Sequence, residues 1–121
     1  MSTPKILLID DEDSVRQMLA EFLNLKGYQT FEANGGAKGL QIAELIKPEI
    51  IILDLKMPEM DGIEVLKKIR AKDISTTVLM LTGVYDETAA RMAIQQGAYD
   101  YLTKPIDLTS LESLIARILP S

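Results

Sequence analysis

Short aliphatic runs alternate with longer amphipathic segments along the chain. The runs Ile6–Ile9, Ile50–Leu53 and Val78–Leu81 are about as long as strands and rich in Ile, Val and Leu, which is typical of strands buried on both faces. Two weaker runs, Tyr28–Ala33 and Ala98–Leu102, each follow a glycine. The hydrophobic pattern therefore predicts five strands.

The segments between these runs have apolar residues at helical spacing. After the first run, apolar side chains recur at i, i+3, i+4, i+7 and i+8, which forms one stripe on a helix of about three turns. They are Val15, Met18, Leu19, Phe22 and Leu23. Ser14 and Gln17 have the spacing of a capping box at the start of this helix, and Gly27 is a natural stop.

Four further helices are predicted in the same way. The second covers Ala37–Ile46 and is ended by Pro48, and the third is capped by the segment Asp61–Glu64. The residues expected to face inward are Ile63, Leu66 and Ile69 in the third helix, Ala89, Ala90, Ala93 and Ile94 in the fourth, and Leu111, Leu114, Ile115 and Ile118 in the fifth. The fourth helix is expected to end at Gly97 and the fifth before Pro120.

Strand and helix alternate five times, which indicates an α/β fold with a parallel sheet and helices on both faces. Right-handed crossovers leave few topologies, and five strands favour the doubly wound, flavodoxin-like order 2-1-3-4-5. The loops are short, and no linker or internal repeat interrupts the pattern. Residues 1–121 are therefore expected to form a single domain, in keeping with their number.

The composition removes most of the chemistry open to a protein. The chain has no cysteine and no histidine. Disulfides, thiolate nucleophiles, zinc sites built on Cys or His, and relays that need an imidazole are therefore excluded. Any reaction must depend on carboxylates, hydroxyls, lysines and a hard metal ion.

Charge and hydropathy bear on the partners. Eighteen acidic residues against thirteen basic ones give a net charge of −5, and the pI is near 4.7. Direct binding of DNA or RNA is not expected, because nucleic acid affinity depends largely on neutralising phosphates. No apolar segment approaches the roughly 18 residues of a membrane span, so no membrane insertion is expected. The lack of cysteine fits a cytoplasmic location.

The carboxyl ends of the predicted strands carry the polar residues of chemical interest. Asp10 and Asp11 follow the first strand, and Asp54 ends the third. Thr82 ends the fourth strand, and the fifth leads into Lys104. In the order 2-1-3-4-5 the first and third strands are neighbours at the switch point where ligands bind. We therefore expect Asp10, Asp11 and Asp54 in one crevice.

Three carboxylates in one crevice repel each other unless something compensates their charge. Mg²⁺ is the natural compensation because only oxygen ligands are available, and Mg²⁺ sites commonly bind phosphates. Lys104 could balance the charge of a phosphoryl group and Thr82 could donate a hydrogen bond to it. A carboxylate is then the plausible covalent acceptor. We favour Asp54, which stands alone after a central strand, whereas Asp10 and Asp11 are paired and better suited to hold the metal.

The stretch of residues 54–62, DLKMPEMDG, resembles the acceptor loop of response-regulator receiver domains, the input half of two-component signalling. The other marks of that family are the acidic pair Asp10-Asp11, Thr82 followed by Gly83, and the run from Tyr101 to Lys104-Pro105. Each mark alone is weak, but together and in this order they are specific. The resemblance covers essentially the whole chain and implies the chemotaxis-regulator-like fold of that family.

The resemblance implies that Asp54 accepts a phosphoryl group from the phosphohistidine of a sensor histidine kinase or a histidine phosphotransfer protein. It implies that Asp11 binds Mg²⁺ directly, that Asp10 helps largely through water, and that the backbone carbonyl of Lys56 is a further ligand. Lys56 and Val84 also occupy positions whose side chains influence the lifetime of the phosphoryl group. The chain would be a signalling switch and not an enzyme, taking part only in its own phosphorylation and dephosphorylation.

The resemblance also implies how the signal leaves the site. Lys104 would pair with the phosphoryl oxygens, and its peptide bond to Pro105 would be cis. Thr82 would move toward the phosphoryl group, and Tyr101 would rotate into the vacated space. The changed surface of the fourth helix, fifth strand and fifth helix would control an effector protein or an output domain absent from this chain. Phosphorylation-linked dimerisation through this surface fits the resemblance, although no particular residue indicates it.

Three other functions stay open on the residues alone. An aspartyl-nucleophile phosphatase would use the same Mg²⁺ chemistry, but such enzymes are expected to have an acid where this chain has Lys56. A flavodoxin-like cofactor binder needs a Ser/Thr/Gly-rich loop after the first strand, where Asp10 and Asp11 would repel phosphate. A receiver-like interaction module without phosphorylation would be favoured by the loss of Asp54 or Lys104, and both are present.

Overall fold

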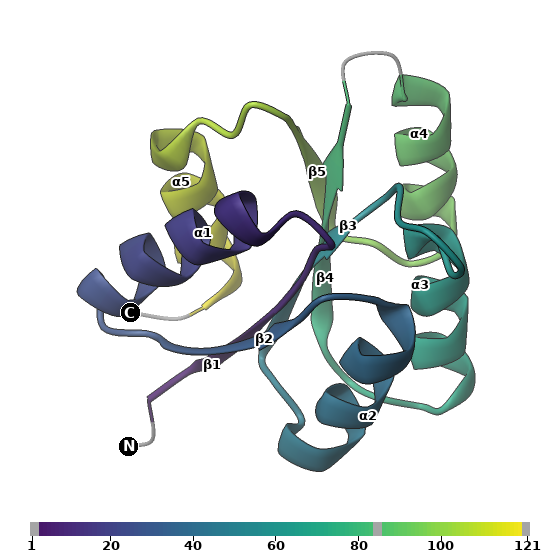
Figure 1. Ribbon diagram of the computed structural model, residues 1–121, viewed down its shortest axis with the longest axis horizontal. Helices are drawn as coiled ribbons and strands as arrows, with labels where there is room; N and C mark the ends of the chain where they lie inside the picture. Colours follow the sequence, from purple (N-terminus) through teal and green to yellow (C-terminus); the bar gives the residue numbers. More distant parts are fainter. Residues whose placement is uncertain (1–2, 84–85, 120–121) are drawn as a thin grey trace.

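A computed structural model describes residues 3–83 and 86–119 of the chain. Within these residues five strands alternate with five helices (Figure 1). The strands are β1 Lys5–Ile9, β2 Gln29–Ala33, β3 Ile50–Asp54, β4 Thr77–Thr82 and β5 Asp100–Thr103. The helices are α1 Asp13–Leu25, α2 Gly36–Ile46, α3 Gly62–Ala71, α4 Glu87–Gln95 and α5 Leu108–Ile118. Val84 and Pro120, named above, lie outside the described residues.

The strands form one parallel sheet in the order β2-β1-β3-β4-β5, which confirms the predicted topology. In the register between β1 and β3, Ile6 lies opposite Ile50. At the carboxyl end of β3, Asp54 lies opposite Leu81 of β4. The observed strand bounds agree with the predicted ones to within two residues. Aliphatic runs mark strands reliably here because both faces of these strands are buried.

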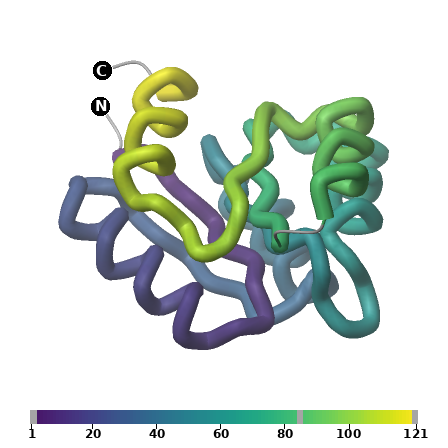
Figure 2. Tube along the Cα trace, turned by 90° about the horizontal axis from the view of Figure 1, so that it is seen from above, coloured from purple at the N-terminus to yellow at the C-terminus, as the bar shows by residue number. Residues whose placement is uncertain are grey.

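Helices cover both faces of the sheet, with α1 and α5 on one face and α2, α3 and α4 on the other. Figure 2, seen from above, shows α1 and α5 on one side of the strands and α3 and α4 on the other. Neighbouring strand residues alternate between the two layers: Leu7 and Ile9 pack with α2 and α3, whereas Ile6 and Leu8 pack with α1 and α5. No helix of the described residues combines the length and the apolar composition needed to cross a membrane.

The predicted start of α1 is wrong. The N-cap is Glu12, and Ser14 lies inside the first turn. The reason is a local turn: Asp10 Oδ1 accepts a hydrogen bond from the backbone N–H of Glu12 at 2.9 Å, which directs the chain into the helix two residues earlier. No side chain caps α1 within the described residues, so the capping box expected from Ser14 and Gln17 does not form.

Two residues predicted to face inward are exposed. Met18 of α1 is 40% exposed and Ile94 of α4 is 39% exposed. In α4 the buried positions are Ala90 and Ala93, so the stripe in contact with the sheet is narrower than the spacing of apolar residues suggests. Met18 lies at the margin of the α1 stripe, where it borders a surface groove described below. Helical spacing alone does not set the width of the buried face.

The connection from β3 to α3 is held close to the strand that it leaves. Asp61 is the N-cap of α3, as predicted, and its Oδ1 accepts from the backbone N–H of Glu64 at 2.9 Å. The backbone N–H of Gly62 donates to the carbonyl of Leu55 at 2.7 Å. A Cβ at Gly62 would overlap the backbone oxygen of Asp54, so only glycine allows this approach. The loop after Asp54 is thereby fixed against the end of β3.

Candidate functional site

Two buried carboxylates lie at the centre of the carboxyl edge of the sheet. Asp10 follows β1 and Asp54 ends β3, and these strands are paired neighbours. The structure thus brings Asp10 and Asp54 together, as the strand order predicts. Asp10 is 2% exposed and Asp54 is 5% exposed. Charges this deeply buried need a compensating partner.

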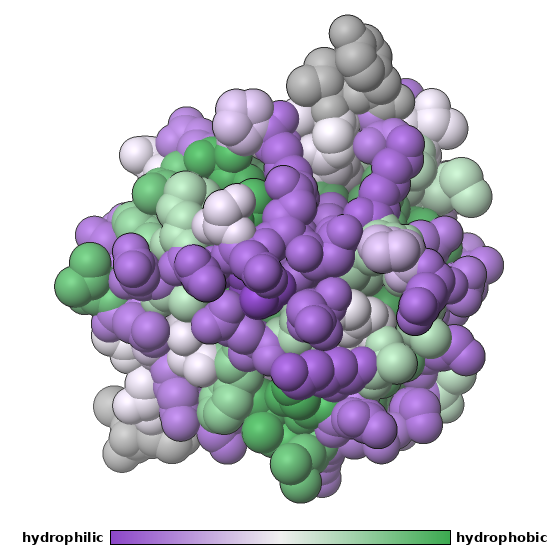
Figure 3. Space-filling view, in the orientation of Figure 1, coloured by the Kyte–Doolittle hydropathy of each residue, from purple (hydrophilic) through white to green (hydrophobic). Residues whose placement is uncertain are grey.

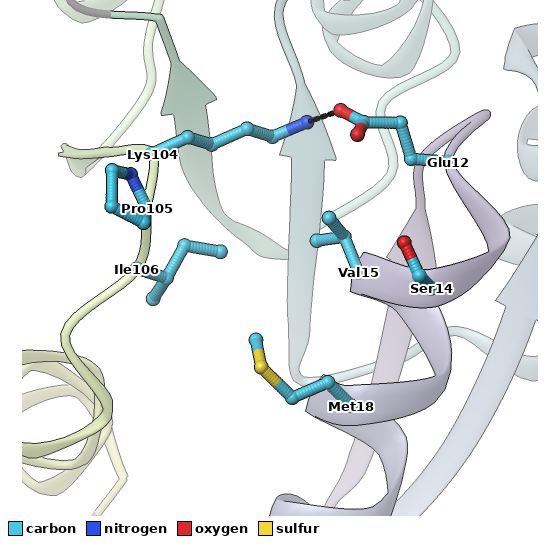
Figure 4. A pocket seen from close by; sticks show the side chains of 7 residues that line it. All are labelled: Glu12, Ser14, Val15, Met18, Lys104, Pro105 and Ile106. Atoms are coloured by element: carbon cyan, nitrogen blue, oxygen red, sulfur yellow. Dashed lines mark hydrogen bonds and ion pairs between the residues drawn. The ribbon is translucent and has the colours of Figure 1, made fainter.

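Lys104 supplies that compensation from the loop after β5. Among the described residues its Nζ pairs with three carboxylates, at 2.7 Å from Glu12, 3.1 Å from Asp10 and 3.3 Å from Asp54. Figure 4 shows the Lys104 side chain reaching from its loop across to Glu12 at the start of α1. The Lys104–Pro105 peptide bond is cis, as the resemblance implies.

The third carboxylate of the crevice is Glu12 and not Asp11. In the described part of the chain, the carboxylate oxygens of Asp10, Glu12 and Asp54 lie within 4.8 Å of one another, and Asp11 is outside this group and exposed. The turn at Asp10 that starts α1 places Glu12 on the side of Lys104. Sequence reasoning missed Glu12, although it directly follows the acidic pair. The role of Asp11 at the metal stays a prediction.

The electrostatics of the crevice bring the titration of Asp54 close to neutral pH. Burial and then the nearby charge of Asp10 raise the pKa of Asp54 from 3.8 to about 7, and the Lys104 ammonium only partly opposes them. For Lys104, burial lowers the pKa, but the hydrogen bond to Glu12 and the charges of Asp54 and Asp10 outweigh it, so the pKa is raised. Lys104 therefore keeps its positive charge. The protonation state of Asp54, in contrast, is easily shifted by a further cation.

The donor set fits a hard divalent cation such as Mg²⁺. The three carboxylates and the single ammonium give a net charge of −2 when every acid is ionised. Asp10 Oδ2 is buried and has no hydrogen-bond partner among the described residues, because its ion pair with Lys104 lacks hydrogen-bond geometry. Asp10, Glu12 and Asp54 offer the oxygen atoms that Mg²⁺ prefers.

Arg16 supports the acidic loop and was not identified from the sequence. Its Nη1 donates to the backbone carbonyl of Asp10 at 2.7 Å. Its other nitrogens pair with Asp13 at 2.7 Å and Glu32 at 3.0 Å, and these two carboxylates raise the pKa of the guanidinium against the effect of burial. The i, i+3 spacing to Asp13 is a signal in the sequence, whereas the contact with Glu32 depends on the pairing of β1 with β2.

The two residues of the predicted switch line one hollow. Thr82 ends β4 and is 1% exposed, and Tyr101 of β5 is half-buried. Both line a cavity of about 280 Å³. Its other lining residues are Gly83, Glu87 and Thr103. The backbone carbonyl of Thr82 also accepts from the backbone N–H of Lys104 at 2.7 Å, which joins the end of β4 to the residue that follows β5.

Lys56 ties the loop after β3 to the start of α4. Its Nζ lies 2.9 Å from Oδ1 of Asp86, the N-cap of α4. The Lys56 side chain is 76% exposed, whereas that of Asp86 is 16% exposed. A contact of this kind is a weak surface pair energetically. It nevertheless links the loop that carries the candidate acceptor with the helix that begins beyond Thr82.

A groove of about 570 Å³ borders the crevice between α1 and the β5–α5 loop (Figure 4). It is lined by Glu12, Ser14, Val15, Met18, Lys104, Pro105 and Ile106. The pair between Lys104 and Glu12 lies at one end of the groove, and apolar side chains together with Ser14 form the rest of its wall. In the space-filling view, apolar side chains gather between α1 and α5, while the centre of this face is hydrophilic (Figure 3).

The order of the five strands and helices is found in proteins of a known signalling family. The family model described as the response regulator receiver domain matches residues 6–116. The chain therefore belongs to the response regulator receiver domain family. The interpretation of the chain as a receiver of two-component signalling, which rests on four short motifs in the sequence, is confirmed.

Similar proteins include both short and long regulators. Sporulation initiation phosphotransferase F of Bacillus subtilis is 34% identical over 99% of this chain and 97% of its own length. Regulatory protein AtoC of Escherichia coli is 40% identical over 95% of this chain, which is 25% of that protein. The alkaline phosphatase synthesis transcriptional regulatory protein PhoP of Bacillus subtilis is 37% identical, and the chain spans 48% of its length. The chain thus spans a quarter to a half of some relatives and nearly all of another.

Solved structures agree with this assignment. The receiver-domain protein from Clostridium thermocellum superposes with a TM-score of 0.90 at 32% identity, covering 95% of this chain and 93% of that one. The chemotaxis protein CheY4 of Vibrio cholerae superposes with a TM-score of 0.90 at 32% identity, covering 98% and 100%. The five-unit fold is therefore shared along nearly the whole of each chain.

Proposed function

We propose that this receiver domain is a phosphorylation-dependent switch in which Asp54 accepts the phosphoryl group. One observation carries the proposal: a buried carboxylate ends a central strand with a second carboxylate and a lysine ammonium beside it. Burial and the charge of Asp10 raise the pKa of Asp54 to about 7. An acceptor needs both the negative charge that attacks and a nearby cation to balance the charge that arrives.

The chemistry is the transfer of a phosphoryl group between two nucleophiles. A carboxylate oxygen of Asp54 forms a bond to phosphorus as the phosphorus–nitrogen bond of a phosphohistidine breaks, and the electron pair returns to the imidazole. Lys104 already lies 3.3 Å from Asp54 and carries a full positive charge. It is placed to pair with the phosphoryl oxygens, and Thr82 supplies a hydroxyl at the neighbouring strand end.

Receiver domains bind Mg²⁺ at an acidic pocket, and the residues of this crevice fit that ion. We propose that Asp11 holds it directly, that Asp10 helps largely through water, and that Asp54 and the backbone carbonyl of Lys56 complete the protein ligands. When bound, Mg²⁺ offsets the mutual repulsion of the carboxylates and the charge of the phosphoryl oxygens. The buried, unbonded oxygen of Asp10 supports this placement.

The signal is proposed to leave through the hollow shared by Thr82 and Tyr101. A Thr82 hydroxyl drawn toward the phosphoryl group frees space on its other side, and the half-buried Tyr101 ring rotates into it. The changed surface is then that of α4, β5 and α5. Phosphorylation-linked dimerisation would use this same surface.

The partners follow from the chemistry. A chain without histidine cannot supply the phosphohistidine, so the donor is a sensor histidine kinase or a histidine phosphotransfer protein. The chain corresponds to part of longer regulatory proteins such as AtoC, and to nearly all of the sporulation phosphotransferase. We propose that residues 1–121 act as one receiver unit that controls either a separate effector or an attached output domain, in the cytoplasm and without direct contact to nucleic acid.

The test is direct. The chain is incubated with acetyl phosphate and MgCl₂ and its intact mass is measured, with Asp54→Asn treated in parallel. The expected result is the mass increase of one phosphoryl group in the wild type, its absence without Mg²⁺, and its absence in Asp54→Asn. An unmodified wild type, or an adduct that persists in Asp54→Asn, overturns the assignment. Sustained release of phosphate from added phosphate esters would instead favour an aspartyl-nucleophile phosphatase.

A further inference from the structure

Lys104 has a partner that the phosphoryl reaction does not require. Its shortest contact is not with either buried carboxylate but with Glu12, at 2.7 Å. This contact joins residues 92 positions apart and closes the end of the groove over the crevice (Figure 4). Glu12 is 55% exposed, while Lys104 is 20% exposed.

We infer that Glu12 is a positioning residue that restrains Lys104 in the unphosphorylated domain and must release it when the phosphoryl group arrives. The inference rests on the proposed function of Asp54. Among the described residues Lys104 Nζ lies within 3.3 Å of the carboxylates of Asp10, Glu12 and Asp54, but it donates a hydrogen bond to Glu12 alone. Lys104 can turn from Glu12 toward a phosphoryl group on Asp54 only if this hydrogen bond is given up.

Glu12 is the partner that gives way most readily. Asp10 and Asp54 are at most 5% exposed, so either carboxylate would be left buried without its counter-charge. Glu12 lies at the mouth of the crevice, where water can hydrate its carboxylate as the pair opens. As long as the pair is closed, however, Lys104 is drawn toward Glu12 and its charge is shared away from Asp54.

The effect of this restraint on the rate of phosphorylation can be predicted. Ion pairs with one largely exposed partner change an equilibrium by about twofold to fivefold. Phosphorylation of Glu12→Gln by acetyl phosphate at saturating Mg²⁺ should therefore be about twofold to fivefold faster than that of the wild type. Glutamine keeps the size of the side chain and loses the charge that binds the ammonium.

Two variants separate the contact from a general effect of charge. Glu12→Asp keeps the charge, but its side chain is one methylene shorter. Its phosphorylation should therefore be accelerated at least half as much as that of Glu12→Gln. Glu21→Gln removes the charge of an exposed glutamate on α1, for which the described residues show no ion pair. Its rate should stay within about 1.5-fold of the wild type, because distant exposed charges are screened. Urea unfolding of each variant confirms that the domain is folded.

The Mg²⁺ concentration that gives half the maximal rate distinguishes this role from that of a metal ligand. For Glu12→Gln it should change less than threefold. A slower Glu12→Gln that needs tenfold more Mg²⁺ overturns the inference in favour of metal ligation. A Glu12→Asp variant that matches the wild type also overturns it, as does an unchanged rate in Glu12→Gln. Absence of phosphorylation in the wild type would instead refute the function on which the inference rests.

Discussion

Asp54 is held in an environment that leaves its ionisation balanced. Burial and the charge of Asp10 oppose the ionised form, while Lys104 favours it, and the pKa of about 7 results. A carboxyl group in this position responds to a small change in nearby charge, such as a bound cation. The same environment costs folding free energy whenever Asp54 is forced to ionise.

Asp54→Asn should therefore stabilise the domain in the absence of metal, and the gain should depend on pH. In the unfolded chain Asp54 loses its proton near pH 3.8, whereas in the folded chain it retains the proton up to about pH 7. The folded wild type thus binds more protons between these values, and its stability falls as pH rises through them. The asparagine variant lacks this loss, so at pH 7.5 it should be more stable by about 2 kcal/mol, allowing for solvent screening.

Urea unfolding in EDTA at pH 4.5, 6 and 7.5 measures this difference. It should grow with pH between about pH 4 and pH 7 and level off above. Glu21→Gln, which neutralises an exposed acid on α1, serves as the control and should show no such rise. A difference between Asp54→Asn and the wild type that does not change with pH would contradict the prediction.

Among the elements, the β3–α3 connection is the most closely fitted. The backbone of α3 begins so near to β3 that Gly62 leaves no room for a Cβ. The Asp61 cap and the hydrogen bond from Gly62 to Leu55 hold the loop in this position. The pair between Lys56 and Asp86 then extends the same loop toward α4. Displacement of the loop would therefore change the position of Asp54 and the start of α4 together.

Gly62→Ala should destabilise the domain by about 2 kcal/mol, because the added Cβ meets backbone atoms that cannot turn aside. Gly35→Ala is the matched control, since a Cβ there meets nothing within 4 Å and the backbone is extended. Because Gly35 is the N-cap of α2, where alanine is less favourable than glycine, its loss should be about 0.5–1 kcal/mol and smaller than that of Gly62→Ala. Urea unfolding of the two variants checks the pair, and equal losses would show that the close approach at Gly62 does not decide the cost.

At the scale of the whole molecule, the net charge of −2 in the crevice predicts that Mg²⁺ binding stabilises the fold. At a concentration a hundred times the Kd, binding to the native state adds about 2.7 kcal/mol, which raises the Tm by roughly 10 °C for a chain of this length. Thermal unfolding with MgCl₂, and with NaCl at equal ionic strength, measures the shift. Asp10→Asn should lose most of it, and a full shift in that variant would disprove the site.

The order of elements could be predicted because each strand is buried on both faces and each helix on one. Such burial produces a local pattern of apolar residues in the sequence. Right-handed crossovers then leave few possible strand orders. The predicted pairing of β1 with β3 is sufficient to place Asp10 beside Asp54. The family motifs could be assigned to strand ends because the strands themselves could be predicted. These features depend on residues that are close in sequence or on rules general to α/β proteins.

Other features depend on contacts between distant parts of the chain. The turn at Asp10 moved the start of α1 away from Ser14, and the narrow contact of α4 left Ile94 exposed. By itself, the sequence determined the fold and the meeting of Asp10 with Asp54 at the carboxyl edge of the sheet. The tertiary structure alone decided that Glu12, and not Asp11, meets Lys104 from 92 residues away. The direction of a side chain at the end of a loop depends on the packing around it. A local pattern of hydrophobic and polar residues does not predict that packing.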